Sequence, residues 1–320
     1  MLFRSVEIIA NTGTANPIIS LQYCRGARLD NVRIREFGDI GIKVDTSHGV
    51  HISNCELRDG DIGIMTTGAC SQTRISGGTI DRMTTLGLDI GDSSAEGVSY
   101  KTRIDNVSMN DCVNGIEVGF KTRYTNIRGC DLAGDTVGIT NYGRDLRVDG
   151  TDILDFNKGI LLESGTTNSL TSASDYSYPR GASINNCFIK TDATSGTECI
   201  DIVIDTAFNL ESVSITNNRF VMDTGDCMSV DLSGAGSADM IGTNITGNNM
   251  YSSDTSARFM YIFSSSGATT HQFEKAVIAN NTNNSGALTA TSDTNDVIIT
   301  TNGDVASGVP VKVKDNTAGA

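Results

Sequence analysis

The sequence predicts an all-β fold of the solenoid class, in which short strands repeat along one axis. A six-residue motif, opened by an apolar residue with Asn or Gly two positions later, recurs at intervals of 21 to 36 residues. Nine or ten residues after the Asn or Gly, a Gly followed by Ile or Leu opens a stretch of alternating apolar residues, which is typical of a half-buried strand. No segment sustains a helical period. Units this short bury their apolar face only by stacking on their neighbours.

The ten units of the motif can be aligned on their first apolar residue. Asn or Gly tolerates the left-handed backbone of a tight corner, so we expect each unit to turn at its third position. We also expect the Asn side chains at this corner to form hydrogen-bonded ladders along the stack. The units begin with Leu29, Ile52, Ile75, Ile104, Ile127, Val148, Ile184, Ile215, Ile245 and Ile278.

Three of the eight cysteines occupy the same position of the motif. Cys55, Cys130 and Cys187 each follow the corner residue directly, where the side chain is small or branched in the other units. We predict that they point inward as a stack of reduced thiols, because buried cysteine behaves as a small apolar residue. This would fit assembly in a reducing cytosol.

The pattern IxNCxIxxxxxGIxV, present as ISNCELRDGDIGI from Ile52 to Ile64, resembles a known family. It is similar to the right-handed parallel β-helix of pectate lyases, polysaccharide epimerases and bacteriophage tailspikes. The resemblance implies a single-stranded parallel β-helix of about ten to eleven rungs and covers about residues 5 to 300. It is specific for the fold and poor evidence for any one chemistry.

The repeat divides the chain into two parts. We predict a parallel β-helix over residues 1–284, and closing strands followed by a frayed tail over residues 285–320, where the motif decays. Residues 3–9 already have the pattern of a strand, with no cap before them. We therefore expect the chain to begin inside a longer polypeptide.

Composition excludes several classes of function. The 320 residues carry a net charge of −14, which disfavours a nucleic-acid partner because phosphate binding needs clustered Lys and Arg. No apolar run approaches the roughly 20 residues that cross a bilayer, so we expect no membrane insertion. No CxxC pair, zinc spacing or calcium-loop motif occurs. We therefore predict no metal and no cofactor.

The longest insertions in the repeat predict a groove. Two long loops, within residues 91–102 and 163–182, leave the same corner three units apart. At about 4.8 Å per rung, their bases would lie roughly 14 Å from each other, which is wide enough for an oligosaccharide chain. Polar side chains and flat aromatic rings of the kind that bind sugars gather there, although the outward positions of any solenoid are polar. The predicted substrate-binding residues are Arg123, Tyr124, Tyr142, Arg144, Asp145, Glu163, Tyr176 and Tyr178, and the floor also offers Asn141.

Two pairs of carboxylates occupy equivalent positions in adjacent units. We predict that Asp89 and Glu117 are catalytic, because a close pair of like charges raises one pKa and so provides a general acid beside a base or nucleophile. Asp131 and Asp152 form the second pair, away from the long loops. In a chain this acidic, either pair can also be solvated surface.

No catalytic motif of the β-helix enzymes is present: we find neither the NTD, GHG and RxK set of polygalacturonases nor the DPHE of alginate epimerases. The resemblance is therefore strongest to tailspikes, which share no catalytic motif. It implies a homotrimer, assembled in the host cytoplasm and carried in the virion tail, that binds and depolymerises a bacterial surface polysaccharide.

Two alternatives remain open for the function. The first is a secreted, monomeric polysaccharide lyase or C5-epimerase acting on an acidic glycan. Lys121, Arg123 and Arg144 would then neutralise the sugar carboxylate, and one of them or Tyr124 would serve as the base. The second is an adhesive solenoid without catalysis.

Overall fold

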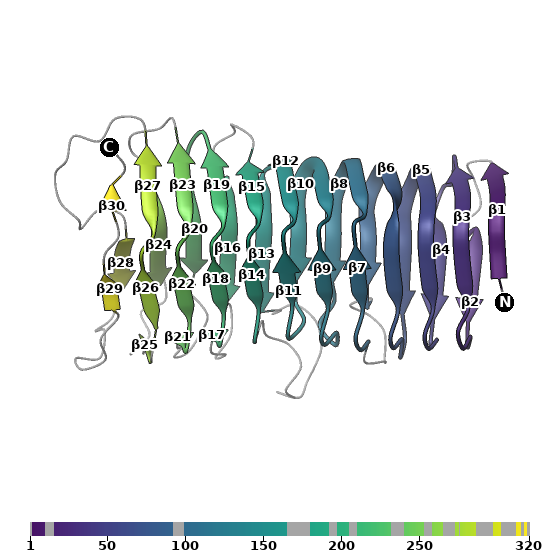
Figure 1. Cartoon of the computed structure of the whole chain (residues 1–320), viewed down its shortest axis with the longest axis horizontal. Coiled ribbons are helices and arrows are strands. Elements are labelled where there is room, and N and C mark those ends of the chain that lie inside the picture. The colour runs from purple at the N-terminus through teal and green to yellow at the C-terminus, as the bar shows by residue number, and fades with distance from the viewer. Residues whose placement is uncertain are drawn as a thin grey trace.

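The chain forms a parallel β-solenoid with its strands stacked along the longest axis of the molecule and its termini at opposite ends (Figure 1). The described residues contain strands and no helix, and none of their segments is a helix able to span a bilayer. The computed structural model describes residues 2–9, 16–91, 99–164, 180–191, 197–204, 210–231, 240–252, 258–264, 273–274, 276–285, 297–301, 312–314 and 317–318.

Each rung contributes to three parallel sheets. In one rung, sheet 1 contains β9 (Asn126–Arg128), sheet 2 the start of β10 (Asp131–Asn141) and sheet 3 the end of β10. The chain turns sharply between sheets 1 and 2, and an irregularity in register within β10 separates sheets 2 and 3.

The strands of sheet 1 stack in register from one end of the solenoid to the other. The first, β1 (Leu2–Ile9), pairs with β3 (Arg28–Arg35), whose second half belongs to sheet 2. Two long strands, β5 (His51–Thr67) and β6 (Arg74–Ile90), run through all three sheets. The others are β7 (Arg103–Asp105), β11 (Arg147–Asp149), β14 (Ser183–Asn185), β18 (Ser214–Thr216), β22 (Asn244–Thr246), β26 (Val277–Ala279) and β29 (Lys312–Lys314).

Sheets 2 and 3 stack in the same way. Sheet 2 continues through the start of β8 (Ser108–Val118), then β12 (Asp152–Phe156), β15 (Phe188–Thr191), β19 (Arg219–Met222), β23 (Asn249–Ser252), β27 (Thr282–Ser285) and β30 (Thr317–Ala318). Besides the ends of β5, β6, β8 and β10, sheet 3 contains β2 (Ile19–Gln22), β4 (Ile40–Asp45), β13 (Lys158–Ser164), β16 (Glu198–Ile204), β20 (Asp226–Asp231), β24 (Arg258–Ser264) and β28 (Val297–Thr301). A small separate sheet joins β17 (Leu210–Glu211), β21 (Met240–Ile241) and β25 (Phe273–Glu274).

The structure confirms the alignment of all ten motif units. Their first apolar residues are register partners from Leu29 to Ile278, and each is at most 2% exposed. Every Asn or Gly at the corner has a left-handed backbone, with φ between 52° at Asn54 and 69° at Gly247. The residue types of the motif therefore follow from the geometry of the corner and the core.

The asparagine ladder lies one position later than we predicted. The corner side chains of Asn54 and Asn186 point to aspartates on the surface. The ladder is instead formed by the next residue of three successive units, Asn218, Asn248 and Asn281, each at most 2% exposed. Each side-chain amide donates to the carboxamide oxygen of the following one, at 2.9 and 3.0 Å. The corner residue is turned outward by its left-handed backbone, so only its neighbour reaches the core.

The inward position of the cysteines is confirmed. Cys55, Cys130 and Cys187 are buried and reduced, and burial raises the pKa of each of their thiols, that of Cys187 to about 12. At the C-terminal end, β28, β29 and β30 pair in register with β24, β26 and β27, and so continue the three sheets. The boundary at residues 284 and 285 remains a prediction.

Replacing Asn248 with Ala should lower the free energy of unfolding by about 3 kcal/mol, because the change leaves the backbone N–H of Asn218 without its acceptor and the buried carbonyl of Ile215 without the side-chain donor of Asn248. Denaturant unfolding measures the effect. The exposed Asn110 on β8 provides the control, and Asn110→Ala should change stability by less than about 0.5 kcal/mol. Equal effects of the two substitutions would contradict the ladder.

The native protein should expose one readily reacting thiol to a disulfide reagent such as DTNB. Cys24 is only partly buried, whereas the other seven cysteines are buried, and the thiolate is the reactive form. All eight thiols should react after unfolding in guanidinium. Detection of an intramolecular disulfide in the native protein by mass spectrometry would refute this arrangement.

Candidate functional site

The predicted catalytic pair lies on the outer face of sheet 3. Asp89 on β6 and Glu117 on β8 are direct register partners, so their Cα atoms are separated by one strand spacing, about 4.8 Å. Asp89 is 8% exposed and Glu117 is half-buried. Because both strands are paired with further rungs on each side, the backbone spacing of the two residues is set by the scaffold.

Two further predicted residues flank this pair on the same face. Tyr142, just after β10, donates a hydrogen bond to Glu163 on β13. Burial raises the pKa of Tyr142 well above its usual range, and the charges of Glu163 and Glu117 add to the shift. The ring of Phe120 packs against that of Tyr142 with centroids 4.5 Å apart. The raised pKa makes the phenol of Tyr142 harder to ionise, so this side chain serves as a hydrogen-bond donor beside an aromatic surface.

A charged cluster that we did not predict lies further along the same face. Lys158 on β13 contacts Asp201 on β16, and its Nζ atom is 3.9 Å from Oε2 of Glu198. Burial of Lys158 opposes its charge, but the hydrogen bond and the charge of Asp201 outweigh burial and raise the pKa of Lys158. The pKa of Glu198 is raised to about 7 by burial, with help from the charges of Asp201 and Asp226 and against that of Lys158. Glu198 is thus a carboxyl group poised to exchange a proton near neutrality.

One sequence signal could have revealed this cluster. Asp201 follows Ile200 as Asp89 follows Leu88 and Glu117 follows Ile116, so all three belong to one column. Thr140 and Leu161 occupy that column between Glu117 and Asp201. Because these two uncharged residues interrupt the column, the alignment of Asp89 with Glu117 does not by itself reveal that Asp201 belongs to the same column.

The other described residues of the predicted groove lie at the corner between sheets 3 and 1. Arg123 and Arg144 are half-buried and adjacent in the stack. Tyr124 and Asp145 adopt the left-handed backbone, with φ of 59° and 56°, at a second corner where Gly49 and Gly181 stand in other rungs. A bulky residue is strained there. Tyr124 is nevertheless 46% exposed, with its ring 5.2 Å from that of Tyr100.

The predicted groove residues therefore separate into two groups. Asp89, Glu117, Tyr142 and Glu163 share the face of sheet 3, whereas the four corner residues face the turn toward sheet 1. Tyr176 and Tyr178, and the middle of both long loops that we predicted as walls, lie outside the described residues.

We predicted that Asn141 lies on the floor of the groove, and this prediction is wrong. It is fully buried, and its side chain both donates to and accepts from the backbone of Gly143, at 3.0 and 3.2 Å. Asn141 immediately precedes the turn out of β10, where its side chain satisfies backbone groups that the sheets do not pair.

The second predicted pair, Asp131 and Asp152, is in register on sheet 2. Burial raises the pKa of Asp152, and the charge of Asp131 adds to the shift. Within the described residues, neither carboxylate forms a hydrogen bond or an ion pair with a Lys, Arg or Tyr side chain. Among all the residues that the structure describes, no group of three or more His, Cys, Asp or Glu side chains is arranged to hold a metal ion.

Glu198 should make stability depend on pH. Because its pKa is raised from near 4.5 to about 7, the folded protein binds this proton more tightly than the unfolded chain does. The resulting stability is complete below about pH 4.5 and is lost as the pH rises through 7. Between pH 4.5 and 8, wild type should lose up to about 3 kcal/mol relative to Glu198→Gln in denaturant unfolding. Parallel pH profiles of the two proteins would disprove the shift.

No family model matches the sequence, and a search of curated proteins also finds no match. Solved structures with the same fold are found. The tailspike protein gp49 from Pseudomonas phage LKA1 superposes with a TM-score of 0.56 at 11% identity, over 89% of this chain and 51% of that one. A mutant tailspike protein of E. coli bacteriophage HK620 gives 0.54 at 10% identity, over 88% and 59%.

Another tailspike mutant of bacteriophage HK620, solved in complex with a pentasaccharide, gives a TM-score of 0.50 at 9% identity, over 92% of this chain and 58% of that one. The chain thus spans between half and two thirds of the length of these tailspikes. At such low identity the similarity establishes the fold alone. The chain is a parallel β-helix with the fold of bacteriophage tailspike proteins.

Proposed function

We propose that this chain is the β-helix part of a tailspike-like protein of a phage virion, and that it binds and depolymerises a bacterial surface polysaccharide as a homotrimer. The observation that carries the proposal is the aligned pair of Asp89 and Glu117 on the face of sheet 3, beside Tyr142 and Glu163. The tailspike fold of the chain supports it, as does the pentasaccharide bound to one protein of that fold.

The positions of Asp89 and Glu117 suit a glycosidase pair. Their strands are about 4.8 Å apart, which lets the side chains place their carboxyl groups at the roughly 5 to 5.5 Å that retaining glycosidases use. Glu117 is the general acid, which protonates the glycosidic oxygen of the leaving sugar. Asp89 attacks the anomeric carbon, and water then releases the sugar from Asp89 with Glu117 acting as base.

The aromatic side chains near the pair provide the binding surface. Phe120 and Tyr142 pack together at 4.5 Å beside the carboxylates, and the exposed ring of Tyr124 lies at the corner beyond. Flat rings with polar edges match the apolar faces and hydroxyl groups of sugars. A chain lying across β8, β10 and β13 would meet the aromatic and acidic groups together.

One observation favours lyase or C5-epimerase chemistry as the second candidate. Arg123 and Arg144 stack in adjacent rungs at the corner, where their charges would neutralise the carboxylate of an acidic sugar. Tyr142 is unsuited to be the base, because its raised pKa keeps the phenol protonated. The base would have to come from the corner, where Tyr124 and Lys121 lie. A non-catalytic adhesin remains the third outcome of the test.

Glu117→Gln and Asp89→Asn should each lower depolymerisation by at least about 100-fold, because each removes a group that transfers a proton or forms the covalent bond. The assay incubates the protein with capsular, lipopolysaccharide and uronate polysaccharides, and follows reducing ends and absorbance at 235 nm. Reducing ends alone indicate a hydrolase, whereas absorbance at 235 nm indicates a lyase.

Asp131→Asn is the matched control for these variants, because it changes a carboxylate of the other aligned pair on sheet 2. It should leave the activity unchanged. Full activity of Glu117→Gln would rule out the assigned acid. If only Glu198→Gln inactivates the protein, the reaction belongs to the Lys158 cluster. Binding without products identifies an adhesin.

A further inference from the structure

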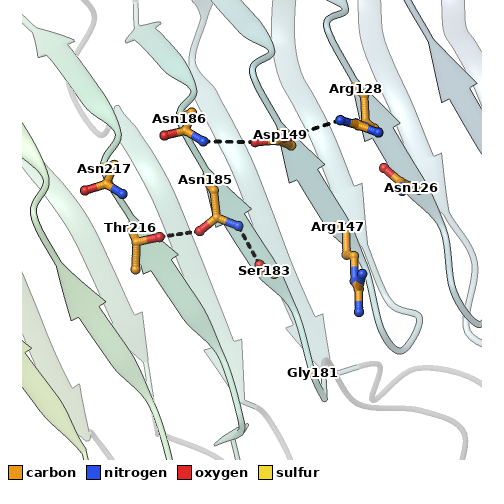
Figure 2. A pocket seen from close by; sticks show the side chains of 10 residues that line it. All are labelled: Asn126, Arg128, Arg147, Asp149, Gly181, Ser183, Asn185, Asn186, Thr216 and Asn217. Atoms are coloured by element: carbon orange, nitrogen blue, oxygen red, sulfur yellow. Dashed lines mark hydrogen bonds and ion pairs between the residues drawn. The ribbon is translucent and has the colours of Figure 1, made fainter.

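A polar groove of about 540 Å³ lies on the outer face of sheet 1, across β9, β11, β14 and β18 (Figure 2). This face is separate from sheet 3 and contains none of the proposed catalytic residues. Its volume is in the range of small-molecule binding sites, and its lining consists of amides, hydroxyls, two arginines and one aspartate.

The aspartate of the groove is already occupied by other partners. Asp149 accepts a hydrogen bond from Nδ2 of Asn186 on one oxygen, at 3.1 Å, and lies 3.6 Å from Nη2 of Arg128 on the other. Figure 2 shows both contacts on the side of Asp149 away from Arg147, whose guanidinium extends toward Gly181. Asp149 therefore does not neutralise the arginine of its own strand.

The ion pairing of Arg147 can be compared with that of an equivalent arginine two rungs earlier. Arg103 stands in the same column as Arg147, and its Nε atom is 2.7 Å from Oδ2 of Asp105 on the same strand. Arg74, one rung before, also reaches Asp105, at 3.4 Å. At Arg147 this pattern is broken, and no carboxylate of the described residues forms an ion pair with its exposed guanidinium.

The described neighbours of the Arg147 guanidinium are neutral polar groups. Asn126 and Ser183 are the register partners of Arg147 on either side. The Oδ1 atom of Asn126 is buried and has no hydrogen-bond partner within the described part of the chain. Asn185 donates to Oγ of Ser183 at 2.7 Å. A buried acceptor without a donor is unfavourable unless a ligand hydroxyl or water supplies one.

We propose that this groove binds a carboxylate-bearing sugar, with the carboxylate on Arg147 and a sugar hydroxyl donating to Asn126. A guanidinium is planar and pairs with carboxylate through two parallel hydrogen bonds. Arg147 offers one positive charge to a carboxylate, and the surrounding amides offer hydrogen-bond partners to hydroxyl groups. A uronic acid unit carries both kinds of group. A protein of net charge −14 gains no general attraction for anions. The groove therefore selects its ligand through the pairing of Arg147 with the sugar carboxylate. It anchors the polysaccharide at a place separate from the proposed cleavage site.

Calorimetric titration of the full chain with trigalacturonate tests the proposal, and the carboxyl-reduced trisaccharide is the matched ligand. Trigalacturonate should bind, and the reduced sugar should bind at least about tenfold more weakly, because a charged hydrogen-bonded pair is lost. Arg147→Gln should lower trigalacturonate affinity by about tenfold or more. Arg147→Lys should restore only part of it, since Lys lacks the paired geometry.

Arg28→Gln is the control substitution, because Arg28 is exposed in the same column of sheet 1 but lies outside the groove. It should leave affinity unchanged. Failure of trigalacturonate to bind would overturn the proposal. Equal loss in Arg28→Gln, or equal binding of the reduced sugar, would also overturn it.

Discussion

The hydrogen bonds between successive rungs are the constraint on which the rest of the molecule depends. Each strand is paired residue by residue with its equivalent in the next rung, as Ile52 is with Leu29 and Ile75. Because side chains alternate between the two faces of a strand, a slip of one residue would exchange the core for the surface along the whole sheet. Register therefore turns ten separate motif units into continuous columns, and every column has one environment. A residue in this fold is explained first by its column and only then by its neighbours in sequence.

The corners show how strictly the column determines residue type. At the corner between sheets 1 and 2 each unit has Asn or Gly, and each adopts the left-handed backbone. At the corner between sheets 3 and 1 the same conformation is adopted by glycine in some rungs and by larger residues in others, namely Gln72, Lys101, Tyr124, Asp145 and Ser212. The first corner keeps to the residues that the geometry favours, whereas the second tolerates strain in order to present larger side chains.

Most of the fold could be predicted from the sequence, because its period reports directly on stacking. The apolar column from Leu29 to Ile278, the corners and the inward thiols follow from spacing and residue type alone. The ladder was misplaced by one residue, since spacing does not reveal that the left-handed corner turns its own side chain outward. For the site, the pairing of Asp89 with Glu117 could be predicted from alignment. The ion pair of Lys158 could not, because its partner Asp201 is 43 residues away across a long insertion. Nor does spacing show that Asn141 is buried or that Asp149 turns to Arg128 rather than Arg147.

Register also explains how one chain offers two chemically different surfaces. Sheet 3 collects carboxylates and a phenol, whereas sheet 1 carries the guanidinium of Arg147 among amides, with no ion pair to a carboxylate of the described residues. The central claim is that polysaccharide lies along sheet 3 and is cleaved there. Hydrogen–deuterium exchange of the Glu117→Gln protein, with and without the polysaccharide that wild type degrades, tests this most directly. Bound polysaccharide should slow exchange at the backbone amides of the turns that follow β8 and β10. Protection confined to sheet 2, or absent from both turns, would contradict cleavage on sheet 3.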